Sequence, residues 1–123
     1  MTESRQVIRD LESVAAEFAE DVISRQKRRQ LDPDDFEQLK GTGFLLTGVP
    51  ADQGGLWEGP AGSARAYSEM VRTIAHGDPS VALVASMHPA VTAFFLGVES
   101  VDDEPDAWRA QRQWVIDSAR DHW

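Results

Sequence analysis

Apolar side chains recur every three to four residues along most of the chain, which is the spacing of amphipathic helices. In the first segment, residues 4–29, Val7, Leu11 and Phe18 fall on one such stripe. The pattern predicts further helices, over about residues 33–41, 61–76, 79–96 and 106–120. No convincing strand pattern is present. We therefore predict an all-α fold, an orthogonal or up-down bundle of about five helices that forms a single domain over residues 1–123.

Two of these helices share a start signal, an aspartate followed by a proline. Asp32 and Asp78 are good N-caps, because a carboxylate accepts a backbone N–H that has no helical partner. The proline that follows each of them falls at the first helical position, where its missing N–H costs nothing. The acidic run at 102–106 contains Pro105 and is expected to open the last helix in the same way.

The helix after Asp32 carries two further local signals. Leu31 and Phe36 have the spacing of a hydrophobic staple, which fixes the direction in which the chain enters a helix. Asp34 and Asp35 place negative charge in the first turn, near the positive end of the helix dipole. We expect both carboxylates to lie on a solvated face.

Glycines are concentrated in the stretch from Gly41 to Gly55. The first of them are placed to end a helix, and Gly54 and Gly55 lie in a loop where glycine permits a positive φ. The stretch lacks the GxGxxG spacing and follows a helix rather than a strand, so it is not expected to bind a dinucleotide. A short apolar segment, residues 44–50, connects the helix-ending glycines to this loop, and it is too short for a strand to be predicted there.

The predicted helix over 79–96 is unusual because it has no polar face. Residues 81–98 contain no charged side chain, and their length approaches that of a membrane span. The flanks are acidic, and the segment includes Ser86, His88 and Pro89. We predict a buried central helix, kinked at Pro89, and no membrane span.

Composition restricts the function classes. The formal net charge is −9, from 12 Lys and Arg against 21 Asp and Glu, which disfavours nucleic-acid binding. There is no cysteine, and the N-terminal residues lack the apolar region of a signal peptide, so we predict a cytoplasmic protein. The basic cluster at 25–29 sits at a predicted helix end, where cations meet the negative end of the dipole.

Candidate chemistry centres on His88. A buried imidazole with a shifted pKa would serve as an acid, a base or a ligand-orienting group. The alternative is a core histidine hydrogen-bonded to a neighbouring carbonyl. No metal site is predicted, because His88 has no ligand at helical spacing and the acidic run lacks the glycine and closing glutamate of a calcium loop. No serine nucleophile motif is present either.

Three motifs, in this order, carry a family resemblance. Residues 29–44 lead from a capped helix into Gly-Thr-Gly-Phe, residues 49–55 read Val-Pro-Ala-Asp-Gln-Gly-Gly, and residues 74–82 read Ile-Ala-His-Gly-Asp-Pro-Ser-Val-Ala. This set resembles the N-terminal helical domain of the acyl-CoA dehydrogenase superfamily. The resemblance implies a larger flavoprotein with a β-barrel and a C-terminal four-helix bundle, binding FAD and forming a homo-oligomer, a tetramer in the family.

The resemblance implies an oxidoreductase that acts on CH–CH groups, performing α,β-dehydrogenation of an acyl-CoA. The family's catalytic base and flavin-contacting loops lie in domains outside this chain, so no catalytic or flavin-binding residue is assigned, and the chain alone is expected to be inactive. Its implied role is to wall the substrate cavity. The candidate lining residues, with core packing as the alternative for each, are Trp57, Met87, His88, Val91 and Phe95.

Two other functions stay open. One is a flavin-dependent monooxygenase of the same fold that hydroxylates an aromatic or heterocyclic substrate. The other is a non-catalytic helical interaction module. The last predicted helix and the residues after it carry Trp108, Trp114 and Trp123, which suggests a surface that is normally covered. We therefore predict that the isolated chain self-associates or is marginally stable.

Overall fold

The computed structural model describes residues 2–123 and is helical over most of its length. Two short 3-10 helices, η1 (Phe44–Gly48) and η2 (Ala51–Gln53), lie between the α-helices. Within the described residues there is no strand, only an isolated bridge between Pro50 and Trp57. The predicted all-α bundle is confirmed. Its α-helices are α1 (Thr2–Glu20), α2 (Val22–Lys27), α3 (Pro33–Gly41), α4 (Pro60–Gly77), α5 (Pro79–Ala85), α6 (Met87–Leu96) and α7 (Asp106–Ala119).

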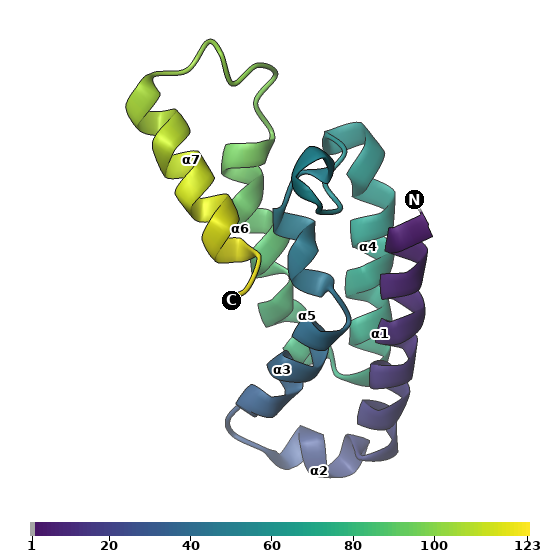
Figure 1. Ribbon diagram of the computed structural model, residues 1–123. Coiled ribbons are helices and arrows are strands. Elements are labelled where there is room, and N and C mark those ends of the chain that lie inside the picture. The colour runs from purple at the N-terminus through teal and green to yellow at the C-terminus, as the bar shows by residue number, and fades with distance from the viewer. Residues whose placement is uncertain (1) are drawn as a thin grey trace.

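The two longest helices, α1 and α4, lie side by side and run in the same direction (Figure 1). Helix α3 and η1 lie between this pair and the outer helices α6 and α7, and α2 closes one end. The main core fills the space among α1, α3, η1, α4 and α5. A smaller apolar cluster of Val49, Leu96 and Ile116 attaches α6 and α7 to the loop after η1.

Gly77 allows α1 and α4 to approach closely. A Cβ atom added at this position would lie 2.5 Å from the carbonyl oxygen of Ala15, which is far inside van der Waals contact. The sequence places Gly77 at a helix end, and α4 does end there. The structure adds a second reason for glycine, the packing of its backbone against α1.

Several predicted helix boundaries were wrong. The first helix ends at Glu20 instead of continuing to residue 29, and α2 follows after a break at Asp21. The predicted helix over 79–96 is divided at Ser86, three residues before Pro89 and within the turn that a helix proline disturbs. The Ser86 hydroxyl donates to the Leu83 carbonyl at 2.7 Å, a local bond that competes with the helical ladder. Pro89 lies in the first turn of α6, where no backbone N–H is needed.

Of the three predicted helix caps, those at Asp32 and Asp78 are present, and the one before the last helix is not. Asp32 accepts a hydrogen bond from the Asp34 backbone N–H, and Asp78 accepts from Ser80 and Val81, as N-caps should. Helix α7 instead begins at Asp106 with Pro105 as its N-cap residue, so no carboxylate caps it. The acidic run before it is irregular.

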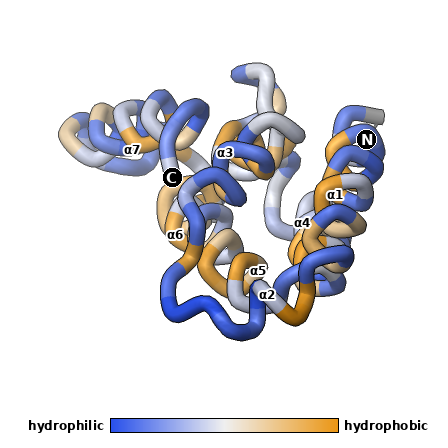
Figure 2. The backbone as a smooth tube through the Cα atoms, turned by 90° about the horizontal axis from the view of Figure 1, so that it is seen from below, coloured by the Kyte–Doolittle hydropathy of each residue, from blue (hydrophilic) through white to orange (hydrophobic). Residues whose placement is uncertain are grey.

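The segment α5–α6 is not the buried central helix that its composition predicts. One side faces the core through Val81, Ala82 and Ala85, but Leu83 is 71% exposed and Phe94 is 81% exposed. Hydrophobic residues cover much of both helices when the molecule is seen from below (Figure 2). By length and composition alone, Pro79–Leu96 would suffice to cross a membrane, with a mean hydropathy of 1.5.

A buried ion-pair cluster joins α2, α3 and the start of α5. The Arg25 guanidinium contacts both carboxylate oxygens of Asp35, at 2.9 and 3.0 Å, and lies 3.2 Å from Asp78. Arg28 reaches Asp35 at 2.7 Å and Asp78 at 3.4 Å. Arg25 also lies over the ring of Phe18, 3.8 Å from its centroid. The expectation that Asp35 is solvated was wrong, because only 3% of this residue is exposed.

Arg25 and Arg28 therefore have a structural role, as predicted for the basic cluster, through ion pairs. Arg25 and Lys27 also lie in the last turn of α2, at the helix end where the cluster was predicted. Burial alone raises the pKa of Asp35, yet the hydrogen bonds from Arg25 and Arg28 outweigh it, and the pKa lies below its usual value. The hydrogen bond to Asp35 likewise raises the pKa of Arg25 despite its burial.

Replacing Asp35 by asparagine is expected to lower the free energy of unfolding by about 2 kcal/mol, because Arg25 and Arg28 lose the carboxylate that they share and keep only Asp78 as a charge partner. Urea unfolding at neutral pH, followed by circular dichroism, measures this. Asp34→Asn is the matched control: Asp34 is the exposed neighbour, and its change should stay within about 0.5 kcal/mol. Equal losses in the two variants would contradict a structural role for the cluster.

The same cluster predicts a pH dependence. Because the pKa of Asp35 is lower in the folded state, folding favours its carboxylate form. Its contribution to stability is complete above the unfolded pKa of about 3.9 and is lost as the pH falls through the folded-state pKa. The stability difference between the original chain and Asp35→Asn should therefore shrink in acid, and a difference that grew on acidification would contradict the assignment.

Candidate functional site

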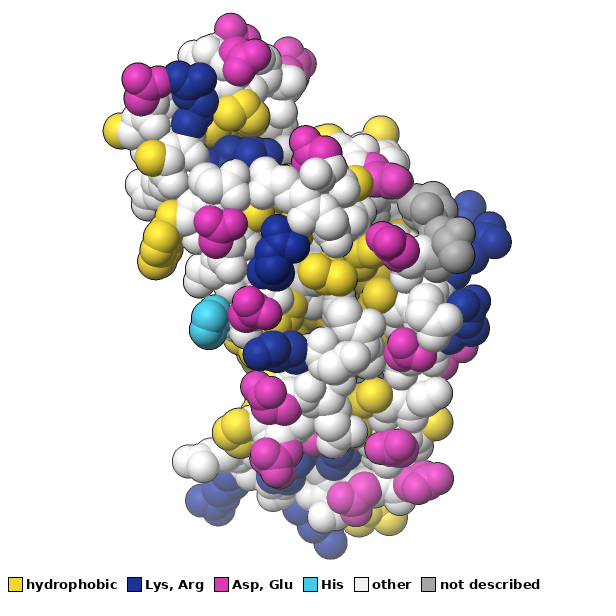
Figure 3. Space-filling model, viewed as in Figure 1, with side chains coloured by type: hydrophobic (Ala, Val, Ile, Leu, Met, Phe, Trp, Pro, Cys, Tyr) yellow, Lys and Arg dark blue, Asp and Glu magenta, His cyan; other side chains and the backbone are white. Residues whose placement is uncertain are grey.

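An open apolar groove of about 640 Å³ lies between α3, α6 and α7. Met87, His88 and Val91 of α6 form one side, and Phe36 of α3 forms another. The third side comes from α7 and the residues after it, namely Trp114, Val115, Ser118, Ala119, His122 and Trp123. Acidic side chains are scattered over the face seen in Figure 3, whereas Glu37 is the only carboxylate among the lining residues of the groove.

Of the five residues predicted to line a cavity, the structure brings three to this groove: Met87, His88 and Val91. Phe95 lies on the same helix but packs against Trp108 of α7, with ring centroids 5.8 Å apart. Trp57 lies in the loop before α4 and packs against Tyr67, with centroids 6.0 Å apart. Neither of these two residues lines the groove.

Sequence reasoning did not assign the α3 and α7 sides of the groove. Phe36 was identified only as part of a hydrophobic staple at the start of α3, and not as a groove residue. The tryptophans Trp114 and Trp123 were identified as part of a surface that is normally covered. The helical periodicity of α7 does not show that this helix packs against α6 and η1, because the contact with η1 depends on residues distant in sequence.

His88 is the polar group of the groove that is most firmly fixed. Its Nε2 lies 3.0 Å from the backbone carbonyl oxygen of Leu45 in η1. A carbonyl only accepts, so Nε2 carries the proton and Nδ1 is the free acceptor of a neutral ring. Burial lowers the pKa of His88, which keeps the ring neutral at physiological pH. His88 is thus hydrogen-bonded as a core histidine would be, and it also borders the groove.

The contact between η1 and α6 is tight around this imidazole. A Cβ atom added at Gly48 would lie 3.0 Å from Nε2 of His88, 3.0 Å from Cγ2 of Thr92 and 3.1 Å from the Cβ of Ala119. Gly48 therefore lets η1, α6 and α7 meet at one point. Of the residues at this meeting point, His88, Thr92 and Ala119 line the groove.

Helix α7 is held in place by polar contacts as well as by Ile116. The Arg112 Nε donates to the Phe95 carbonyl at 3.0 Å. The side chains of Gln53 and Gln113 hydrogen-bond to each other, and Arg120 donates to the Gln53 carbonyl at 2.9 Å. These bonds connect α7 to both α6 and η2, so the third side of the groove has a fixed position.

The loop that contains Gly54 and Gly55 follows Gln53, the residue that contacts α7. Gly54 has a φ of +86°, and a Cβ atom on Gly55 would lie 2.0 Å from the Val49 carbonyl oxygen. The Trp57 N–H donates to that carbonyl at 3.0 Å, which closes the loop. The predicted role of these glycines, to shape a loop, is confirmed, with Gly54 needed for its φ and Gly55 for close approach.

The chemistry of the groove is that of apolar recognition. Its polar groups include a neutral imidazole, the Thr92 and Ser118 hydroxyls, and the side chains of Glu37 and His122. Throughout residues 2–123, no three His, Asp or Glu side chains are grouped so that they would hold a metal ion. The lining includes no lysine or arginine. The groove is therefore suited to a hydrocarbon chain or a ring and unsuited to a phosphate.

We expect His88 to titrate below the ordinary histidine pKa of about 6.5. Because its folded-state pKa is lowered, the unfolded chain takes up the proton first as the pH falls. The His88 contribution to stability is thus complete above about pH 6.5 and is lost as the pH falls through the folded-state pKa. An NMR titration of the ring protons checks this, with His88→Gln identifying the resonance. A midpoint at or above the ordinary value would contradict the burial argument.

No protein-family model, curated protein or solved structure matches this chain. The resemblance to the acyl-CoA dehydrogenase superfamily accordingly stands as a prediction from the three motifs, and the groove stands on its own geometry.

Proposed function

We propose that this domain forms one wall of the substrate cavity of an FAD-dependent, acyl-CoA dehydrogenase-like oxidoreductase. The observation that carries the proposal is the position of the groove, against the middle of α5–α6. The resemblance assigns this helical segment to the cavity wall. Met87, His88 and Val91 were selected from the sequence for that reason, and all three border the groove.

The groove has the size and composition of a small-molecule site. Its volume of about 640 Å³ lies within the range of roughly 300–1,000 Å³ that is usual for such sites. Most of its lining is apolar, and a few polar groups, such as His88 and Ser118, provide orientation. An acyl chain buried there would gain about 0.8 kcal/mol for each methylene removed from water.

The described residues do not fit the rest of the cofactor and substrate. With no lysine or arginine in the lining, the groove has no cation to pair with the pyrophosphate of FAD or the phosphates of coenzyme A. Dehydrogenation removes an α-proton and a β-hydride, and FAD supplies the acceptor for the hydride. We assign neither step to a residue of this chain. The proposed contribution of this chain to the reaction is to hold the acyl group and to exclude water from it.

A second candidate function is a helical interaction module, and the exposed face of α5–α6 favours it. Leu83, Met87 and Phe94 are all more than half exposed, at 71%, 56% and 81%. Exposed apolar patches that exceed a few hundred Å² usually mark a protein or membrane contact. Trp114, which is 69% exposed on α7, extends the apolar surface.

The acyl-binding proposal predicts that octanoyl-CoA binds to the purified chain and that coenzyme A without an acyl group does not. Isothermal titration measures both affinities. Val91→Asp should weaken octanoyl-CoA binding at least about tenfold, because it places a charge in the apolar groove. Leu83→Asp is the matched control, since Leu83 is exposed on the same helical segment but does not line the groove.

Equal binding of octanoyl-CoA and coenzyme A would contradict this proposal, as would equal effects of the two variants. A visible spectrum taken on the same sample is a further check. Stoichiometric flavin absorbance would show that the chain binds the cofactor by itself, which the groove composition does not support. Binding of aromatic acids in preference to octanoyl-CoA would favour the monooxygenase alternative.

The interaction alternative predicts self-association through α5–α6. Phe94→Glu should shift the chain toward a monomer in sedimentation velocity, because a buried contact would then contain an unpaired charge. Ala61→Glu, which lies at the exposed start of α4, should leave the sedimentation coefficient unchanged. A monomeric original chain with a cooperative thermal melt would count against self-association.

A further inference from the structure

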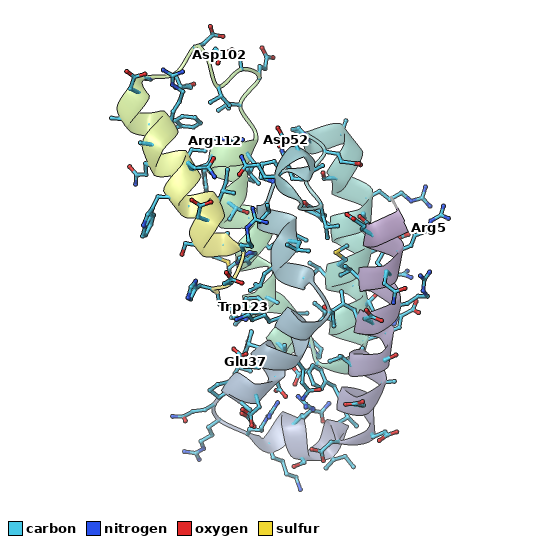
Figure 4. The ribbon with its side chains drawn as sticks, viewed as in Figure 1. Arg5, Glu37, Asp52, Asp102, Arg112 and Trp123 are labelled. Carbon is cyan, nitrogen blue, oxygen red and sulfur yellow. The ribbon has the colours of Figure 1, made fainter. Side chains whose placement is uncertain are left out.

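Trp123 occupies a box of three rings beside the groove. Its ring centroid lies 5.2 Å from that of Phe36, with the planes nearly perpendicular at 84°. It lies 5.8 Å from Phe44, with the planes nearly parallel at 22°, and 5.7 Å from His88, at 68°. All three distances and orientations are those of favourable aromatic pairs. Figure 4 shows Trp123 between the end of α7 and α3.

One polar contact completes the box. The indole N–H of Trp123 donates to the backbone carbonyl of Phe36 at 3.2 Å. A flat ring is therefore held by one stacked partner, two edge contacts and one hydrogen-bond acceptor. This combination recognises both the plane of a ring and the direction of a donor on it.

The walls of the box are fixed independently of their occupant. Phe44 belongs to the main core and is fully buried. His88 is held by its bond to Leu45, and Phe36 packs against the core from α3. The indole itself follows the end of α7 at Ala119 and is 43% exposed. It is thus attached to the core through its ring contacts, and removing it would leave Phe36, Phe44 and His88 in place.

We propose that Phe36, Phe44 and His88 form a binding site for a neutral planar aromatic ligand with one N–H or O–H donor, and that Trp123 is its displaceable intramolecular occupant. A free ligand would stack on Phe44 and donate to the Phe36 carbonyl. Substituents on its ring would extend into the groove toward Met87 and Val91. The site shares Phe36 and His88 with the groove, but its argument rests on the ring contacts of Trp123 and not on the acyl-binding proposal.

Because Trp123 is covalently attached to the chain, a free ligand must compete with its ring for the box. The backbone N–H groups of Asp121 and His122 both donate to the Ser118 carbonyl, so the tether of Trp123 is short and ordered. Its ring therefore has an effective concentration of at least about millimolar. The original chain should therefore bind such a ligand weakly, and a chain without the indole should bind it more tightly. Engineered apolar cavities are known to take up small aromatic molecules in this way.

Indole binding to Trp123→Ala tests the proposal. Indole should bind this variant at least about tenfold more tightly than it binds the original chain. It should also raise the melting temperature of the variant, because a ligand that binds only the folded state stabilises it. The matched control is Trp114→Ala, which removes an indole from the same groove but none of the box contacts. Indole should affect Trp114→Ala no more than the original chain.

Two further measurements keep the proposal falsifiable. Adding indole to Trp123→Ala should shift the ring resonances of His88, and 1-methylindole, which has no N–H donor, should bind more weakly. Equal responses of the two tryptophan variants, unchanged His88 resonances or equal binding of the two indoles would each overturn it. If Trp123→Ala does not fold, Trp123→Leu replaces it, with the same outcomes. A failed octanoyl-CoA titration has no bearing on these results.

Discussion

The buried cluster of Arg25, Arg28, Asp35 and Asp78 is the constraint on which the arrangement of the helices depends. Asp78 both caps α5 and contacts the two arginines of the α2 region, while Asp35 connects those arginines to α3. Charges removed from water are costly unless they are paired and hydrogen-bonded. Few alternative packings of α2, α3 and α5 would keep all four groups paired. The cluster thus fixes the position of α5–α6 relative to α3, and the groove lies between these elements.

Features set by local chemistry were predictable, and those set by distant contacts were not. The caps at Asp32 and Asp78 depend on residues within one turn, so the sequence indicated them correctly. Asp35 looked like any acidic residue in a first helical turn. Its burial follows from Arg25, ten positions earlier in the chain, and Arg28. No periodicity shows such a pairing, because it depends on where α2 packs after the break at Asp21.

The candidate site was likewise only partly predictable, because distant contacts decide most of it. Residues 79–96 are apolar on every side, so their pattern indicates a helix without indicating which side is buried. The structure divides them among the core, the groove and an exposed face, and His88 and Phe95 consequently have different surroundings. The groove also needs α7, whose position comes from Ile116 and from hydrogen bonds to η2 and α6. Only the α6 side of the site was therefore accessible to sequence reasoning.

The composition of the groove bears on what it contributes to function. Its best-placed polar group, His88, is neutral and already donates to a backbone carbonyl, so one ring nitrogen is left as an acceptor. A general acid would need a proton to give at that nitrogen, and an electrostatic stabiliser would need a charge or an oriented donor. The lining instead has ring faces and aliphatic side chains that select by shape and by loss of water contact. The groove thus presents an apolar surface with one neutral imidazole, a composition that suits contact with an apolar group.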